Sequence, residues 1–495
     1  MNKIIGFLIF AGFAVPAEAQ RMLNLDSCRA LAIRNNKVLN ISKLNQDVAG
    51  NIRRVAKTQY LPHVDGLGSY TYMSREVSLL SDDQKSTLGS MGSTIVSEAS
   101  SKVTPIITQM VQAGMISQQM AGTIGQNIGT MGESMATALN GIGDKIIDDF
   151  HTNTHNLWTA SIMVTQPLYM GGRITAANNI ARYNENLTAN QYDATMQATL
   201  FDIDQAYWTV VSLKHKKALA ESYLTTVKKL DSDVSKMITE GVATRSDGLS
   251  VSVRVNEAEM TLTQVDDGLA LSKMYLCQLC GLPINESIVL ADEDKQNLVT
   301  DNASVTPDVQ MALNSRPELK MLGNTVDISK ENVKMVRADY MPNLAATGGY
   351  MVSNPNVFNG FQNKFAGVWT VGVLLRVPIW NWNEGVYKVH AAKAASHIAE
   401  MQLSDAREKI ELQVNQGAFK VNEAGKRLTM ANQNTAKADE NLRCATLGFK
   451  EGVLPTTNVL EAQTAWFQAQ SQRIDAEIEV KLAEVNMKKA LGVLQ

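Results

Sequence analysis

The chain has 495 residues, of which 45% are hydrophobic but only 6% are aromatic, and it contains 11 prolines. Its formal net charge is −3 at pH 7, so it lacks the basic surface by which nucleic-acid-binding proteins are recognised, and we expect no nucleic-acid partner. The length would suit about three ordinary domains, but the scarcity of Pro and aromatic residues favours long helices over β-sandwiches.

The first residues have the pattern of an export signal. Lys3 precedes an apolar run over residues 4–15, which is followed by Ala17-Glu18-Ala19. This pattern predicts a secretory signal peptide over residues 1–19. No Cys stands at the cleavage point, so a lipid anchor is not indicated there, although it is not excluded. No later run of 18 or more apolar residues occurs, so the sequence predicts no membrane-spanning helix.

Two parts of the chain resemble each other at fixed offsets. A shift of 280 residues aligns Tyr60-Leu61-Pro62 with Tyr340-Met341-Pro342, and a shift of 211 aligns Glu240-Gly241-Val242 with Glu451-Gly452-Val453. The offsets differ, so the first copy contains an insertion, at about residues 74–155. We therefore predict two internal structural repeats, at residues 20–282 and 308–495, joined by a linker or equatorial strap at residues 283–307.

Each copy has the same predicted order of elements: a short helix, a pair of strands, a long helix, a tight turn and a returning helix. Residues 173–240 contain no Pro or Gly, and apolar residues recur at three- and four-residue steps, which is typical of an uninterrupted α-helix about 100 Å long. A helix of this length needs others beside it, as in a coiled coil. The remaining helices are predicted at about residues 27–58, 247–280, 308–337, 386–451 and 457–491.

Four segments alternate between apolar and other residues, at residues 60–73, 157–169, 340–352 and 365–380. Apolar alternation over about ten residues with aromatic residues near the ends is typical of transmembrane β-barrel strands. An ordinary antiparallel hairpin in a soluble domain is the alternative. With the export signal, the pattern favours the barrel, and the aromatic residues predicted to lie at the membrane surface are Tyr60, Tyr70, Trp158, Tyr169, Trp369 and Trp380. Four strands cannot close a barrel, so several chains must contribute strands to one barrel.

The insertion is rich in Gly, Ser, Gln and Met, and it lies in the loop of the first strand pair, so we expect it to face outside the cell. Its methionines suggest either a copper-handling array or, as we favour, one or two amphipathic helices in which the Met side chains pack. His151 and His155 are four residues apart and either share a metal ion or are solvated loop residues.

The chain shows no motif for catalysis, nucleotide binding or a metal centre, so we predict no enzyme activity, cofactor or metal site. Cys277 and Cys280 form a C-x-x-C pair without a second ligand pair. They suggest a redox pair or half of a metal site, but small apolar residues on one helix face are the interpretation we favour.

The repeat, the signal peptide and several phrases together resemble the TolC-like outer-membrane efflux protein family over nearly all of the mature chain. The phrases are LDSCRALA at residues 25–32, YLP at 60–62, QPLYMGG at 166–172, GVAT at 241–244, YMP at 340–342, VPIW at 377–380 and GVLPTTNVLEA at 452–462.

This resemblance implies a mixed α and β membrane protein. The expected assembly is a homotrimer with a 12-stranded outer-membrane β-barrel, four strands per chain, continued by a long α-helical coiled-coil barrel across the periplasm of a Gram-negative bacterium. The implied partners are a periplasmic adaptor (membrane fusion) protein, an inner-membrane pump, for which we choose the resistance–nodulation–division type, and outer-membrane lipid.

The resemblance also assigns roles to residues of the two helical turns. It implies a periplasmic gate at Asn458 and Glu461, with Asp247 and Phe449 as latch residues. The family's acidic ring would be one carboxylate per chain, because Asn458 is neutral. A solvated carboxylate is the alternative interpretation of Glu461. The adaptor-docking tips would be Gly241, Val242, Thr244, Gly452, Val453 and Pro455.

The function implied is that of a passive exit duct for efflux. The outer-membrane component of type I protein secretion is one alternative, and an exported helical scaffold that forms no pore is another. The sequence does not identify the substrates.

Overall fold

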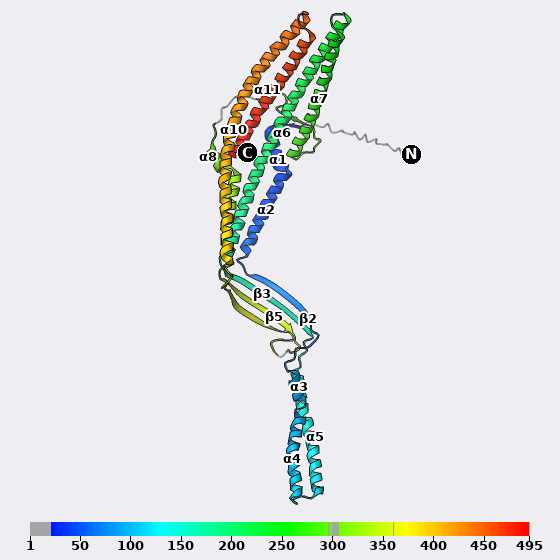
Figure 1. The fold of residues 1–495 in the computed structure, drawn as a ribbon, viewed down its shortest axis with the longest axis vertical. Helices are drawn as coiled ribbons and strands as arrows, with labels where there is room; N and C mark the ends of the chain where they lie inside the picture. Colours follow the sequence, from blue (N-terminus) through cyan, green and yellow to red (C-terminus); the bar gives the residue numbers. More distant parts are fainter. Residues whose placement is uncertain (1–20, 296–297, 299–305, 360, 495) are drawn as a thin grey trace, which may run out of the picture. The chain divides into compact units, whose positions relative to one another are not determined.

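A computed structural model describes residues 21–494 except residues 296–297, 299–305 and 360 (Figure 1). The predicted signal peptide lies outside the described residues. The chain divides into two compact units. The helical unit contains the chain up to residue 57, Gly172–Asp339 and the chain from Trp380 onward, and the strand unit contains Thr58–Gly171 and Tyr340–Ile379.

The helical unit is built on two helices of 67 residues each, α6 (Arg173–Thr239) and α10 (Glu384–Lys450). At 1.5 Å per residue each is about 100 Å long. Helix α6 packs against α7 (Arg245–Cys280), α9 (Pro317–Ala338) and α11 (Thr456–Leu491), and α10 packs against α11 and α9. The predicted long helices are therefore present. Gly417, Gly425 and Gly448 lie within α10 and do not interrupt it.

The two predicted short helices are each divided in two. The first is split at Asn36 into α1 (Leu25–Asn35) and α2 (Lys37–Thr58), and the second is split at Arg316 into α8 (Val309–Ser315) and α9. Both residues have extended backbone conformations. Asn36 Oδ1 accepts the backbone N–H of Val38 at 2.8 Å, so its side chain caps α2. Pro317 disfavours a helical conformation at Arg316 and opens α9.

The linker contributes to the core of the helical unit. Its strand β4 (Ile288–Leu290) pairs in parallel with β1 (Arg21–Leu23), and both strands carry buried side chains of the core cluster. Tyr207 of α6 is fully buried in the same cluster, and its hydroxyl donates to Asp292 Oδ2 at 2.6 Å. Cys277 and Cys280 are buried there as free thiols, so they pack as small apolar side chains.

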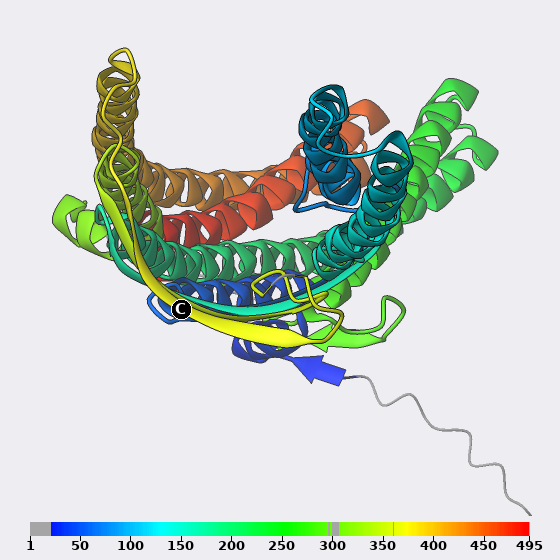
Figure 2. The same cartoon turned by 90° about the horizontal axis from the view of Figure 1, so that it is seen from below.

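The strand unit contains one antiparallel sheet of four strands in the order β2-β3-β5-β6, which Figure 2 shows as a curved band. The strands are β2 (His63–Tyr72), β3 (Asn156–Met170), β5 (Asn343–Asn354) and β6 (Ala366–Arg376). All four predicted segments form strands. Tyr60 and Trp380 lie just outside the strand ends.

The insertion forms helices, as predicted, namely α3 (Asp82–Gly89), α4 (Met91–Gln112) and α5 (Gln118–Asp149), of which α4 and α5 pack together (Figure 1). The prediction that its methionines pack is wrong for a single chain. Five of them are exposed: Met110, Met115, Met120, Met131 and Met135. Other residues form the seam between α4 and α5.

His151 and His155 lie on either side of Glu76, with His151 Nδ1 at 3.4 Å and His155 Nε2 at 3.5 Å from its carboxylate oxygens. His155 Nδ1 is 2.8 Å from the carbonyl oxygen of Met73. In the described part of the chain, no group of three or more His, Cys, Asp or Glu side chains is arranged to hold a metal ion. Among the described helices, none combines the length and the hydropathy needed to cross a membrane.

Candidate functional site

The first helical turn joins α6 to α7 and ends in a reciprocal cap. Gly241 has φ +75°, the left-handed conformation that favours glycine after a helix, and Val242 N–H donates to the carbonyl of Met237 at 2.8 Å. Thr244 begins α7. Asp247 N–H donates to Thr244 Oγ1 at 3.2 Å, and Thr244 N–H donates to Asp247 Oδ2 at 3.0 Å.

The Asp247 carboxylate also accepts the Thr244 hydroxyl at 2.6 Å. These hydrogen bonds from Thr244 hold the pKa of Asp247 below its usual range. Within this chain, Asp247 therefore stabilises the start of its own helix.

The second turn, between α10 and α11, repeats the geometry without the cap. Gly452 has φ +71°, and Val453 N–H donates to the carbonyl of Gly448 at 2.8 Å. Pro455 occupies the position before α11 and provides no side-chain hydrogen bond. Leu454 fills the space over Gly448 instead, because a Cβ added there would lie 2.7 Å from Leu454 Cδ1.

A shared apolar cluster packs the two helical hairpins together near their turns. Phe449 of α10 is buried in it with residues of the other three helices: Tyr223, Val227, Leu230, Val234, Val251, Ala258, Val459 and Leu460. The rings of Tyr223 and Phe467 pack with their centroids 4.6 Å apart and their planes tilted by 30°. Phe449 therefore holds the turns together by packing.

Asn458 and Glu461 lie on the exposed side of the first turns of α11, whereas Val459 and Leu460 between them are buried. This brings both predicted gate residues onto one solvent-facing surface. The Glu461 carboxylate forms no salt bridge with any described residue.

Two hydrogen bonds that the sequence did not predict join α10 to α11 above the second turn. Trp466 Nε1 donates to Asp439 Oδ1 at 2.6 Å, and Gln470 Nε2 donates to the same oxygen at 3.2 Å. No local pattern marks this pairing, since the residues are about 30 positions apart. The Thr244–Asp247 cap did have a signal, a Thr followed three residues later by an acidic residue at a helix start.

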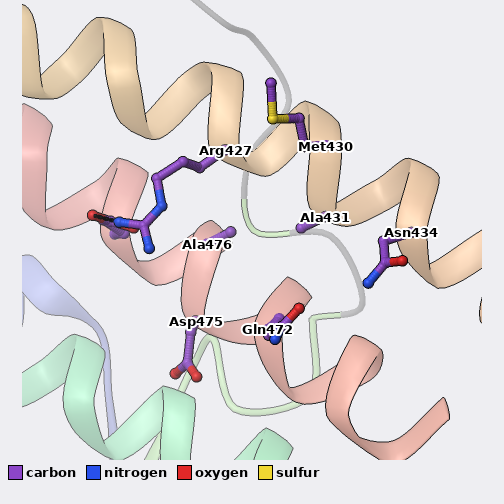
Figure 3. A pocket seen from close by; sticks show the side chains of 8 residues that line it. Arg427, Met430, Ala431, Asn434, Gln472, Asp475 and Ala476 are labelled. Atoms are coloured by element: carbon purple, nitrogen blue, oxygen red, sulfur yellow. Dashed lines mark hydrogen bonds and ion pairs between the residues drawn. The ribbon is translucent and has the colours of Figure 1, made fainter. Parts of the chain in front are cut away.

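Farther along the same helices, an open groove of about 530 Å³ lies between α10 and α11 (Figure 3). Its lining mixes charged side chains, such as Arg427 and Asp475, with apolar ones, such as Met430. Arg427 Nη1 pairs with Glu479 Oε1 at 2.8 Å, and Asp475 pairs with Lys216 of α6 at 2.6 Å. These ion pairs join neighbouring helices, and none of the described residues that line the groove is a nucleophile with an adjacent base.

The family of this chain follows from its similarity to known proteins. The sequence model described as "Outer membrane efflux protein" matches residues 124–282 and 309–493, which is more than half of the chain. The alkaline protease secretion protein AprF of Pseudomonas aeruginosa is 24% identical over 62% of this chain and 64% of AprF, just under two thirds of its length. The outer membrane protein TolC of Vibrio cholerae is 22% identical over 68% of this chain and 77% of TolC.

A similar fold occurs in the crystal structure of the outer membrane protein VceC from Vibrio cholerae. It is 14% identical, has a TM-score of 0.70 and covers 94% of this chain and 96% of VceC. The family match confirms the resemblance drawn from the repeated phrases. This chain therefore belongs to the outer membrane efflux protein family, whose members are passive channels of the outer membrane of Gram-negative bacteria and not enzymes.

Proposed function

We propose that this chain is the exit duct of a tripartite efflux system, a homotrimer that passively conducts substrates from an inner-membrane pump and a periplasmic adaptor to the outside. The proposal rests mainly on the four-stranded sheet, which has an uncovered apolar face and two unpaired edges. On β6, every second residue is apolar and more than 60% exposed, namely Trp369, Val371, Val373 and Leu375. A face of this kind suits lipid.

The edges of the sheet require further copies. No described strand pairs with the outer edge of β2 or of β6. Within a bilayer, each unpaired backbone group costs several kcal/mol, so the edges must be closed. The four strands alternate in direction, so β6 of one copy is antiparallel to β2 of the next. Two copies would give eight strands and a filled interior, whereas three give twelve strands and space for a lumen.

The helical unit supports the same assembly. Helix α2 exposes an apolar stripe at three- and four-residue spacing, formed by Val38, Ile41, Leu44, Val48, Ile52 and Val55. Helix α10 exposes Met401, Phe419 and Met430. Such stripes are the seams by which long helices pack against neighbours. Neighbouring copies would cover them and build the helical tunnel.

The two-repeat organisation also remains our proposal, with the boundaries given above. Equivalent helices have equal lengths: α2 and α9 have 22 residues, α6 and α10 have 67, and α7 and α11 have 36. The similar glycine turns at Gly241 and Gly452 support it further.

The turns between the long helices would form the periplasmic entrance. In the trimer, three copies of Glu461 near the axis would favour cations over anions. Gly241, Val242, Thr244, Gly452, Val453 and Pro455 would meet the adaptor, and the pump would be of the resistance–nodulation–division type. The aromatic residues Tyr70, Trp158, Tyr169 and Trp369 are at least half exposed and would meet the lipid interface, together with Tyr60 and Trp380.

A second candidate function, type I protein secretion, is favoured by the similarity to AprF, which is named for alkaline protease secretion. Deletion of the gene separates the two functions. Efflux predicts increased susceptibility to small hydrophobic toxins with unchanged protein secretion, whereas type I secretion predicts the loss of a secreted protein from the medium.

The assembly is tested by pairing the free edges. In a variant in which the exposed Cys444 is replaced by Ser, Leu67→Cys in β2 is combined in turn with a cysteine at each of residues 368–374 in β6. The trimer predicts intermolecular disulfides at one register, and a cysteine at Ala346 in β5 is the control, because both edges of β5 are already paired. The absence of cross-links at every register would contradict the closed barrel.

A further inference from the structure

The hairpin of α4 and α5 has a tightly packed seam. A Cβ added to Gly92 would lie 2.3 Å from the carbonyl oxygen of Ala136, and one added to Gly132 would lie 2.9 Å from Val96 Cγ1. Asn140 bridges the helices, because its Oδ1 accepts the N–H of Gly92 and its Nδ2 donates to Ser93 Oγ, both at 2.8 Å. These contacts fix how each helix is rotated about its own axis.

The exposed apolar residues of both helices have one relation to this seam: each comes immediately before a residue that is buried or half-buried within it. Their exposed fractions run from 38% to 74%. One residue is about 100° of rotation around a helix, and in an antiparallel pair the positions before the seam fall on the same side. They therefore form one surface, the Met–Ile face: Ile95, Ile106, Met110, Met120, Met131, Met135 and Ile142.

The opposite surface of the hairpin is polar. The residues that immediately follow the same seam positions are all exposed and are polar, charged or Gly: Ser97, Thr108, Gln112, Gly122, Glu133, Thr137 and Asp144. The hairpin therefore gathers its large exposed apolar side chains on one face, where the polar residues Lys102, Thr123 and Asn127 also precede seam positions. A contiguous exposed apolar surface of this kind marks an interaction site.

The Met–Ile face has few charges, which argues against a partner selected by electrostatics. Residues 91–143 contain only Glu98, Lys102 and Glu133 as charged residues, and Asp144, Lys145, Asp148 and Asp149 follow at the end of α5. Of the first three, only Lys102 precedes a seam position. Lys102 therefore brings one charge per copy to this face, and the rest of the face within residues 91–143 is uncharged. Met side chains also adapt their shape to a neighbouring apolar surface.

The position of the hairpin in the chain would bring the hairpins of neighbouring copies together. The hairpin lies between β2 and β3, and β2 is the strand that would pair with the next copy in the proposed trimer. Three hairpins would therefore be tethered beside one another at high effective concentration. We propose that the hairpins of the trimer pack through their Met–Ile faces into a six-helix bundle on the outer side of the membrane. This inference rests on the proposed function.

The test uses the full chain in native outer membranes, with Cys444→Ser as background. Met131→Cys places a thiol on the Met–Ile face, and Thr137→Cys places one on the polar face of the same helix as the matched control. Oxidation with copper phenanthroline, followed by non-reducing gels, measures disulfide-linked dimers. The bundle predicts a dimer yield several-fold higher for Met131→Cys than for Thr137→Cys.

The mass of each variant in detergent separates the failure of this inference from that of the proposed function. A monomer would overturn the trimer and the bundle together. A trimer in which the two cysteines cross-link equally, or not at all, would overturn the bundle alone. A bimane label on Met131→Cys that is quenched by spin-labelled lipid would also overturn it, since the face would then lie on the membrane surface.

Discussion

Arg29 of α1 donates two hydrogen bonds to Asp204 of α6, from Nε to Oδ1 at 2.8 Å and from Nη2 to Oδ2 at 2.5 Å. Asp204 is fully buried, and the Arg29 side chain is 18% exposed. This bidentate pair joins the first helix of the chain to the long helix against which it packs.

Arg29→Ala should therefore destabilise the helical unit strongly. It would leave the Asp204 carboxylate buried without its partner, and breaking a buried ion pair costs about 3–5 kcal/mol. The free energy of unfolding, measured with denaturant in detergent, checks this. The matched control is Arg427→Ala, since the pair of Arg427 and Glu479 is largely exposed and should contribute about 1 kcal/mol or less. If the two substitutions lowered the free energy of unfolding equally, the buried pair of Arg29 and Asp204 would contribute no more than an exposed pair.

Gly452→Ala should disturb the second turn by its backbone conformation alone. No atom lies within 4 Å of the position of an added Cβ, but φ is +71°, and a residue with a Cβ pays about 1–2 kcal/mol there. Gly323→Ala within α9 is the control, because it also meets no neighbour and has ordinary helical geometry. It should stabilise the chain by up to about 1 kcal/mol. Thermal unfolding of both variants measures the difference. A lower unfolding temperature for Gly323→Ala would contradict the explanation by backbone conformation, because that residue has ordinary helical geometry.

The start of α7 should lose stability in acid. The hydrogen bonds from Thr244 lower the pKa of Asp247 in the folded chain, so the cap contributes stability above the unfolded value of about 3.9 and loses it as the pH falls through the folded value. Amide hydrogen exchange of residues 245–248 should therefore become faster between pH 5 and pH 3, relative to the intrinsic rate. The uncapped start of α11 is the internal comparison, and an equal change in both would argue against the cap.

Glu461→Gln should reduce the cation preference of the channel without changing its assembly. If three carboxylates lie near the axis, removing them removes the field that attracts cations and repels anions. Reversal potentials in a salt gradient measure this preference. Glu479→Gln, on the same helix but paired with Arg427, should leave the preference unchanged. An unchanged preference in Glu461→Gln would place that side chain on an outer surface.

Much of the fold could be predicted because its signals are local. The absence of Pro and Gly from residues 173–240 predicts α6 to within one residue, and alternation identifies all four strands. The breaks at Asn36 and Arg316 escaped prediction, although Pro317 marks the second. The exposure of Met131 and its neighbours could not be predicted, because it depends on which residues form the seam with a helix distant in sequence.

The candidate site was predicted only in part, for the same reason. The turns follow from Gly241 and Gly452, whose left-handed conformations end the long helices. The burial of Phe449 depends on packing among four helices, and the bond from Trp466 to Asp439 joins two of them. The role of Glu461 depends on where neighbouring copies place it, and a local sequence pattern carries no information about that.

Single-channel recording of the purified protein in planar bilayers, with its mass in detergent measured on the same sample, shows directly whether the chain forms a trimeric channel. We expect a trimer that inserts and gives small, cation-selective openings that are easily blocked. A protein that remains a monomer, or that never inserts, would contradict the barrel and favour an exported helical scaffold that forms no pore.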